Sequence, residues 1–235
     1  IAAGGLSFQA AENRVTAVTL AGPHGESLTV APKHIALTAG AGNARLLERL
    51  GLLASPEVPQ MQRRPLHMVL VRGEQLPALS GHCVDGAKTR VTITSDVDSR
   101  GRTVWQVGGQ LAEEGVKFDP PTLIRRGERE LSEAIPGVDL TGCDCATYKV
   151  DRAEGHSGGV RPEDAQIFTA GNVHTCWPTK LALAPVLARR LAERIGDAAA
   201  RPFAPPADWP RPVVAAPPWE TAEWSVAKEP LRRAA

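Results

Sequence analysis

The chain has 235 residues, of which 43% are hydrophobic and 23% charged, and its formal net charge is +1. These values are ordinary for a globular protein with a sizeable core, and the near-zero charge gives no indication of nucleic acid or an anionic membrane as a bulk electrostatic partner. No apolar run reaches the roughly 18 residues that span a bilayer, and no signal peptide is recognisable. Four cysteines suit a reduced, cytoplasmic protein better than a disulfide scaffold.

The first third of the chain predicts short strands and a small helix. Alternating and β-branched residues predict strands over residues 6–10, 14–21 and 27–30, of which the last two form a hairpin. A short buried strand is expected over residues 34–39, and a helix over residues 44–53 has leucines on one face.

The sequence GAGNAR, residues 40–45, lies between that strand and that helix. It keeps two glycines of the dinucleotide fingerprint G-x-G-x-x-G, Gly40 and Gly42. Arg45 stands where the third glycine lets helix and strand pack closely. Two interpretations are open: a phosphate fingerprint, or a glycine-rich turn that makes a secondary ligand contact.

The middle of the chain predicts an antiparallel sheet. The expected strands are residues 64–72, 90–95, 103–107 and 139–152. A proline-containing connector at residues 55–65 marks a domain transition. Residues 77–85 and 155–162 are expected to be loops. An apolar stripe predicts a helix over residues 122–134. An antiparallel sheet of this kind has one face free for solvent or for a site.

The C-terminal stretch is rich in proline and tryptophan. Proline at the density of residues 201–218 blocks helices and central strands, so an extended tail is expected. Trp209, Trp219 and Trp224 are costly to leave in water, which favours a tail that lies along the folded body or a partner. A free, disordered tail is the alternative.

A strand, a loop and a helix are predicted over residues 166–195. The apolar run at residues 166–170 predicts a strand that enters Gly171 and Asn172. A short polar and aromatic loop follows, and the residues from Pro178 to Lys180 open an amphipathic helix. The free backbone amides at a helix N-terminus can bind an anion or a dipole.

The start of this helix is ambiguous because of Pro185. Proline cannot lie deep inside a regular helix, so either the helix begins near residue 184 or its first turn is irregular. Gly196 is expected to end the helix. A plain helix with Thr179 as its N-cap is the alternative to a binding site.

Two side chains are candidates for chemistry. Arg152 ends an apolar strand before a glycine-rich loop, where its guanidinium can pair with a substrate carboxylate or phosphate. The alternative is a salt bridge to a neighbouring acidic residue such as Glu154. His174 lies in the predicted loop and can act as a general base, with a surface or hydrogen-bonding histidine as the alternative.

A metal site is a further alternative. Its candidate ligands would be Cys143, Cys145, His156, His174 and Cys176. Their spacing differs from that of zinc knuckles, and buried structural cysteines are the default, so no metal is predicted.

The order of motifs resembles a known family. The motifs are HIALTAGAGNARLL (34–47), RRPLHMVLVRG (63–73), VWQVGGQLAEEGV (104–116), TYKVDRAEG (147–155) and AGNVHTCWPTKLALAP (170–185). Together they resemble the C-terminal portion of FAD-dependent oxidoreductases of the D-amino-acid-oxidase superfamily. That superfamily includes glycine and sarcosine oxidases and FAD-dependent glycerol-3-phosphate dehydrogenases.

The resemblance implies FAD as the cofactor and assigns residues to it. Gly40 and Ala41 would pass close to FAD, and the loop before the last helix would turn its backbone amides towards the flavin ring. The cofactor-binding residues implied in and beside this loop are Gly171, Asn172, Pro178, Thr179, Lys180 and Leu181. Arg152 would match the arginine of an Arg-Pro pair that binds the substrate carboxylate, although Ala153 follows it here.

The resemblance also implies a mixed α+β and α/β fold. A partial FAD-binding, Rossmann-like domain would combine with an antiparallel substrate-binding domain, and the N-terminal dinucleotide-binding βαβ unit is missing. The implied division is residues 1–58 and 153–196 for the FAD-binding domain, 59–152 for the substrate-binding domain and 197–235 for the tail. The chain begins in strand-like sequence without Met, so the remaining N-terminal part or a partner subunit is expected to complete the FAD site.

The expected function is that of the C-terminal part of a flavoenzyme. It would take a hydride from a C–N or C–O bond of a small, anionic substrate bearing a carboxylate or phosphate. One alternative is a non-catalytic domain or subunit that acts through partner contacts. Another is a fragment of a zinc-binding oxidoreductase.

Overall fold

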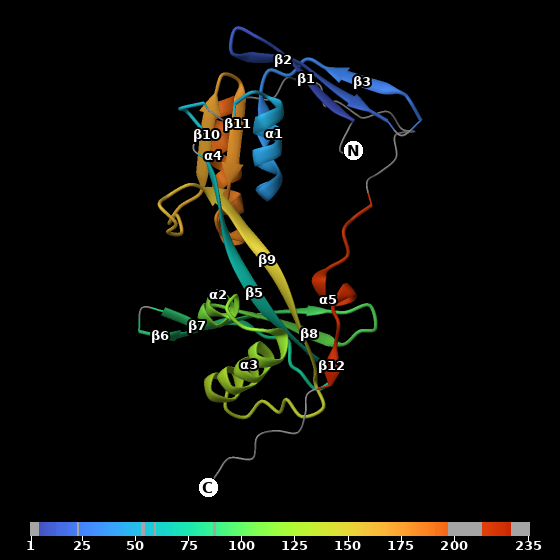
Figure 1. Ribbon diagram of the computed structural model, residues 1–235, viewed down its shortest axis with the longest axis vertical. Coiled ribbons are helices and arrows are strands. Elements are labelled where there is room, and N and C mark those ends of the chain that lie inside the picture. Colours follow the sequence, from blue (N-terminus) through green and yellow to red (C-terminus); the bar gives the residue numbers. More distant parts are fainter. Residues whose placement is uncertain are drawn as a thin grey trace. The chain divides into compact units, whose positions relative to one another are not determined.

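The computed structural model describes residues 5–22, 24–52, 55–58, 60–86, 88–196 and 213–226. The chain divides into two compact units. Unit 1 comprises Ile1–Arg64 and Arg152–Val213, and unit 2 comprises Pro65–Asp151 and Val214–Ala235. Both contain antiparallel sheets and helices, so the fold is mixed α and β (Figure 1).

The first sheet of unit 1 is a three-stranded antiparallel meander. It consists of β1 (Leu6–Ala11), β2 (Arg14–Ala21) and β3 (Ser27–Val30), in that spatial order. Glu12 and Asn13 form the tight β1–β2 turn with positive φ angles of 50° and 60°. The alternation in the sequence predicted all three strands correctly.

The second sheet of unit 1 has the order β10-β11-β4. Its strands are β10 (Gln166–Ala170), β11 (Val173–Trp177) and β4 (Ile35–Leu37). β10 and β11 pair antiparallel, whereas β11 and β4 pair parallel. The prediction of a loop after Gly171-Asn172 was wrong, because these two residues form a tight turn and all five residues of β11 are buried. A strand covered on both faces lacks the polar alternation by which a strand is recognised.

Each of the two parallel strands leads through a short 3₁₀ turn into a helix. β4 is followed by η1 (Gly40–Gly42) and α1 (Asn43–Arg49), and β11 by η2 (Leu181–Leu183) and α4 (Ala184–Ile195). The expected helix start at Pro178–Lys180 was therefore wrong, and the alternative start near residue 184 is the observed one. Pro185 occupies the first turn of α4, where a missing N–H costs nothing.

The sheet of unit 2 has six strands in the order β12-β9-β5-β8-β7-β6 (Figure 1). Their bounds are β5 (Met61–Gly73), β6 (Ser80–Asp85), β7 (Lys88–Val97), β8 (Thr103–Gly108), β9 (Asp144–Gly155) and β12 (Ser225–Val226). Residues 80–85 were expected to be a loop but form β6, which pairs antiparallel with β7. This edge strand was missed because its residues are mostly exposed and lack an apolar alternation.

Two helices pack on one face of this sheet. They are α2 (Gln110–Gly115), which the sequence did not predict, and α3 (Pro120–Ala134), which it did. The carboxylate of Asp119 caps α3 by accepting a hydrogen bond of 2.8 Å from the Thr122 amide. The core under these helices includes Val69, Trp105 and Leu123.

The described part of the tail packs on the opposite face of the sheet. Trp219, in the short helix α5 (Pro218–Thr221), is 8% exposed and packs with Leu70, Val104 and Ala146. The prediction that the tail lies along the folded body is therefore confirmed for this part. The segment is not purely extended, however, because it includes a helical turn and the strand β12. Residues 197–212, with Trp209, lie outside the described residues.

Polar contacts hold the same segment in place. The carboxylate of Glu220 accepts hydrogen bonds from the Ser99 amide and hydroxyl at 2.7 and 2.8 Å. The guanidinium of Arg72 lies 3.8 Å from the centre of the Trp224 ring, a favourable cation–π contact. The segment is thus part of the fold of unit 2.

Replacing Trp219 by alanine should destabilise unit 2, because it empties a buried aromatic site. The expected loss is about 3 kcal/mol. Val214→Ala is the control, since Val214 is 88% exposed. Urea unfolding of both variants checks this, and equal unfolding midpoints would show that the segment is not part of the core.

Candidate functional site

The candidate site lies at the carboxyl ends of β4 and β11. Because these neighbouring strands are parallel, the loops that follow them leave the same edge of the sheet. In open α/β sheets, ligands bind outside the carboxyl ends of parallel strands. The loops after β4 and β11 carry six of the residues predicted from the sequence to bind a cofactor: Gly40, Ala41, Pro178, Thr179, Lys180 and Leu181.

Asn43 and Trp177 tie the two loops together. Asn43 is fully buried; its side-chain carbonyl accepts a 2.8 Å hydrogen bond from the Ala39 amide and its NH₂ donates to the Cys176 carbonyl at 3.1 Å. The indole N–H of buried Trp177 donates to the Gly40 carbonyl at 3.2 Å. The two strand ends are therefore bonded to each other rather than merely adjacent.

The η1 and η2 turns present backbone donors at this edge. The amides of Gly40 and Ala41, and those of Leu181 and Ala182, begin helical turns, so no carbonyl of the same turn precedes them to accept a hydrogen bond. A Cβ added to Gly40 would meet no atom within 4 Å, so the space beside this turn is open. Donors arranged in this way suit an anion or a carbonyl dipole.

The loop after β11 is strained at Thr179. Its φ is +61°, which is uncommon for a β-branched residue. It forms a three-residue turn in which the Lys180 amide donates to the Pro178 carbonyl at 2.7 Å. Next to it, Leu181 is 88% exposed. Backbone strain of this kind clusters at ligand-binding sites.

A third loop, residues 156–165, enters the sheet at the same edge, because Gln166 pairs with the last residue of β11. The Asp164 carboxylate is 2.7 Å from the Arg190 guanidinium of α4. At the start of the loop the side chain of Gln62 accepts hydrogen bonds from the Ser157 and Gly159 amides at 3.0 and 3.1 Å. The loop is thereby fixed at both ends.

Glu154, just before this loop, is a fully buried carboxylate. Arg64 donates two hydrogen bonds to it, at 2.8 and 2.9 Å, and Gln62 a third at 3.1 Å. Burial alone would raise the pKa of Glu154, but these hydrogen bonds and the charges of Arg64 and Arg152 lower it, so the group stays ionised.

Arg152 therefore lies next to an ion-paired carboxylate. It stands inside β9 rather than at its end, and its charge acts on Glu154. An Arg-Pro dipeptide occurs further along, at Arg161-Pro162, in the loop that reaches the candidate edge. Among the described residues, the exposed Arg161 side chain has no hydrogen-bond or ion-pair partner. The dipeptide itself was the signal that could have identified Arg161 from the sequence.

Gly171 and Asn172 lie at the other end of β11. The side chain of Asn172 exchanges hydrogen bonds of 2.8 and 2.9 Å with the Val15 amide and carbonyl, which joins the two sheets of unit 1. A Cβ on Gly171 would lie 1.8 Å from the Asn13 carbonyl oxygen, so only glycine fits there. Both residues have a structural role, and the structure does not bring them to Gly40 or Leu181.

His174 lies within β11 and is 4% exposed. Its Nε2 is 3.0 Å from Nδ1 of His34, and its Nδ1 is 2.9 Å from the Thr169 hydroxyl. Burial, followed by the charges of His34 and Arg194, lowers the pKa of His174. Since both ring nitrogens have partners inside the fold, the geometry makes His174 a packed, hydrogen-bonded residue.

The cysteines of the metal alternative lie in hydrophobic surroundings. Cys143 and Cys145 belong to the core of unit 2, where burial raises the pKa of their thiols to about 11 and about 12. Burial likewise raises the pKa of Cys176. Among the described residues no group of three or more His, Cys, Asp or Glu side chains is placed to hold a metal ion.

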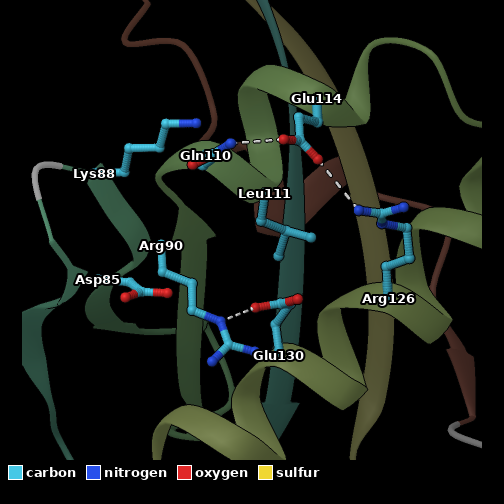
Figure 2. Close-up of a pocket in the computed structure, with 8 residues that line it drawn as sticks. All are labelled: Asp85, Lys88, Arg90, Gln110, Leu111, Glu114, Arg126 and Glu130. Atoms are coloured by element: carbon cyan, nitrogen blue, oxygen red, sulfur yellow. Dashed lines mark hydrogen bonds and ion pairs between the residues drawn. The ribbon is translucent and has the colours of Figure 1, made fainter.

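The described residues of unit 2 line a smaller and a larger cavity. The smaller, of about 150 Å³, lies between the β6–β7 hairpin and the helices α2 and α3 (Figure 2). Its charges are largely paired, since Arg90 contacts Glu130, and Glu114 accepts from Gln110 and Arg126 at 2.7 and 3.2 Å. Such a lining leaves little net charge for a ligand. The larger cavity, of about 1040 Å³, lies beside β9.

The chain is similar to a probable FAD-dependent oxidoreductase, PA4991, of Pseudomonas aeruginosa. The two sequences are 42% identical over 208 residues, which make up 86% of this chain and 52% of the relative. The crystal structure of PA4991, described as an FAD-dependent oxidoreductase, aligns with 92% of this chain at a TM-score of 0.74 and 36% identity.

The similarity covers only part of that relative. The chain spans 52% of its sequence and 58% of the chain in the crystal structure. No family model matches the sequence. Among the described residues, no helix is both long enough and apolar enough to cross a bilayer.

The buried His174 should make unit 1 less stable in mild acid. Its pKa is lowered in the fold, whereas an unfolded histidine titrates near about 6.5. The free energy of unfolding is therefore unaffected by His174 above this pH and falls as the pH drops below it, because the unfolded chain takes up the proton more readily than the folded chain. His174→Gln should flatten the decline in unfolding curves between pH 7 and pH 5, and the exposed His24→Gln should not. An unchanged slope in His174→Gln would rule out His174 as its source.

Proposed function

We propose that this chain is the C-terminal part of an FAD-dependent oxidoreductase and that the flavin ring binds at the carboxyl edge of β4 and β11. The observation that supports this most strongly is the pair of bonded loops that begin 3₁₀ turns at Gly40-Ala41 and Leu181-Ala182, where the first amides have no acceptor within the turn. The similarity to PA4991 over most of the chain supports the choice of FAD.

The residues at this edge fit one part of FAD. The flavin ring has a carbonyl-bearing edge that gains negative charge on reduction, and the amides of Leu181 and Ala182 at the start of η2 would stabilise that charge. Thr175, fully buried two residues before the end of β11, has a hydroxyl without a hydrogen-bond partner among the described residues. The complete site would supply that partner.

The same residues do not form a main cradle for the FAD phosphates. Asn43 of GAGNAR uses its side chain to join Ala39 to Cys176, and Arg45 replaces the third glycine. We propose that the phosphates bind residues outside the part of the protein present here. β4 is the edge strand of its sheet among the described residues, and its open side would accept a strand from that further part of the protein or from a partner subunit.

When bound, FAD would accept a hydride from a C–N or C–O bond of a small anionic substrate. The chain would bind and orient the reactants. The amides of Leu181 and Ala182 would hold the flavin edge, and Arg161 would pair with the substrate carboxylate or phosphate. Arg161 fits this role better than Arg152, which already acts on Glu154.

Leu181→Pro in the complete protein tests the proposed flavin contact. Lys180 is extended, with φ −136° and ψ 144°, so proline fits after it and removes only the N–H of residue 181. Loss of one hydrogen bond of about 1 kcal/mol should raise the Kd of FAD roughly five-fold. Leu181→Ala is the matched control, because it keeps the N–H and removes an exposed side chain. Titration of each apoprotein variant with FAD measures the two Kd values. Equal Kd values would refute the proposal, and so would a complete protein that takes up no flavin.

Arg161→Met and Arg152→Met distinguish the two candidate substrate arginines. A panel of small carboxylates and phosphates is titrated into the holoprotein while the flavin absorbance is followed. Arg161→Met should weaken any ligand that perturbs the spectrum by at least about tenfold, the size of one charged hydrogen-bonded pair. Arg152→Met should leave it within about twofold. The opposite order would return the role to Arg152.

A further inference from the structure

We propose that the outer edge of β9 beyond β12 binds an extended peptide, which adds to the sheet of unit 2 as a further strand. The cavity of about 1040 Å³ lies along this edge and has no part in the proposed flavin site. The open strand edge beside the cavity suits a peptide segment, which can pair with it through its backbone.

The edge itself supplies the main attraction. β12 covers only the first two residues of β9, pairing Ser225 with Cys145 and Val226 with Asp144. Among the described residues, no other strand of the sheet lies on this side of β9. From Ala146 to Val150 the strand therefore offers unpaired backbone N–H and C=O groups, which are a template for strand addition.

Two walls make this edge a groove. One wall is the N-terminal half of α3, with Pro120, Pro121 and Ile124. The other is the tail, with Pro218, Ala222 and Trp224. Residues Ala146, Thr147, Tyr148 and Lys149 of β9 lie between them. The lining is predominantly apolar at its walls.

The charges of the groove favour a neutral occupant. Arg125 and Lys149 are balanced by Glu128 and Glu223 in the lining. The complementary partner is an extended segment with alternating apolar residues, little charge and no proline, since proline cannot donate to a ladder.

The chain's own tail already docks in this way. β12 adds to the same edge, the Ser225 hydroxyl donates to the Cys145 carbonyl at 3.1 Å, and Trp219 fills a pocket on the adjoining face. A peptide bound from Ala146 onwards continues the line of β12.

A labelled peptide tests the proposal with the complete protein. The probe is an acetylated, amidated heptapeptide of alternating valine and threonine with lysine at each end, followed by fluorescence anisotropy. A second probe has the same sequence with every backbone amide N-methylated. Glu223→Trp fills the groove from an exposed lining position, and Arg129→Trp places the same side chain on an exposed position of α3 outside it.

The parent peptide should bind the wild type and Arg129→Trp alike. Glu223→Trp and N-methylation should each weaken binding by at least about tenfold, because they remove the space or the backbone hydrogen bonds. Absence of binding to the wild type at millimolar peptide overturns the proposal. Equal binding by Glu223→Trp overturns it as well, because the peptide would then bind outside the groove. Equal binding of the methylated peptide also overturns it, because the peptide would then bind without strand pairing.

Discussion

The candidate site depends on the parallel pairing of β4 with β11 and on the buried amide of Asn43 that locks it. Three residue pairs form the ladder, and such a short parallel contact is weak by itself. Asn43 adds one hydrogen bond to the loop after β4 and one to the end of β11. Because Asn43 is fully buried, losing either partner would leave an unsatisfied amide in the core, so the two loops are held at one edge.

The remaining features of unit 1 follow from this constraint. Trp177 can reach the Gly40 carbonyl only when the strand ends are level. The loop from β9 to β10 arrives at the same edge because β10 pairs antiparallel with β11. At the opposite end, Asn172 joins β11 to the meander through Val15. Structural and candidate binding residues thus separate to the two ends of a single strand.

The sequence predicted elements well where the apolar period was clear. The meander, α3 and the strands β7 and β8 follow alternation or a helical stripe, and β5 follows a strongly apolar run. β11 was missed because it is buried on both faces, and β6 because it is an exposed edge. The positions of Gly40 and Leu181 at a single edge depend on the parallel register, and no local pattern encodes a pairing between residues so far apart in sequence.

Side-chain roles were harder to predict than elements. Arg152 and His174 were chosen for their residue type and predicted position, yet Arg152 acts on a buried carboxylate and His174 is packed between Thr169 and His34. Burial and hydrogen-bond partners decide whether such groups are available, and both arise from tertiary contacts. The positive φ of Thr179 gave no sequence signal either, because it is imposed by the turn between β11 and η2.

A crystal structure of the complete protein with FAD bound is the most direct test of the central claim. The account predicts a carbonyl of the flavin ring within about 3 Å of the amide nitrogen of Leu181 or Ala182, the usual hydrogen-bond distance. It also predicts Gly40 and Ala41 beside the same cofactor. A flavin bound away from the carboxyl edge of β4 and β11 would contradict the account.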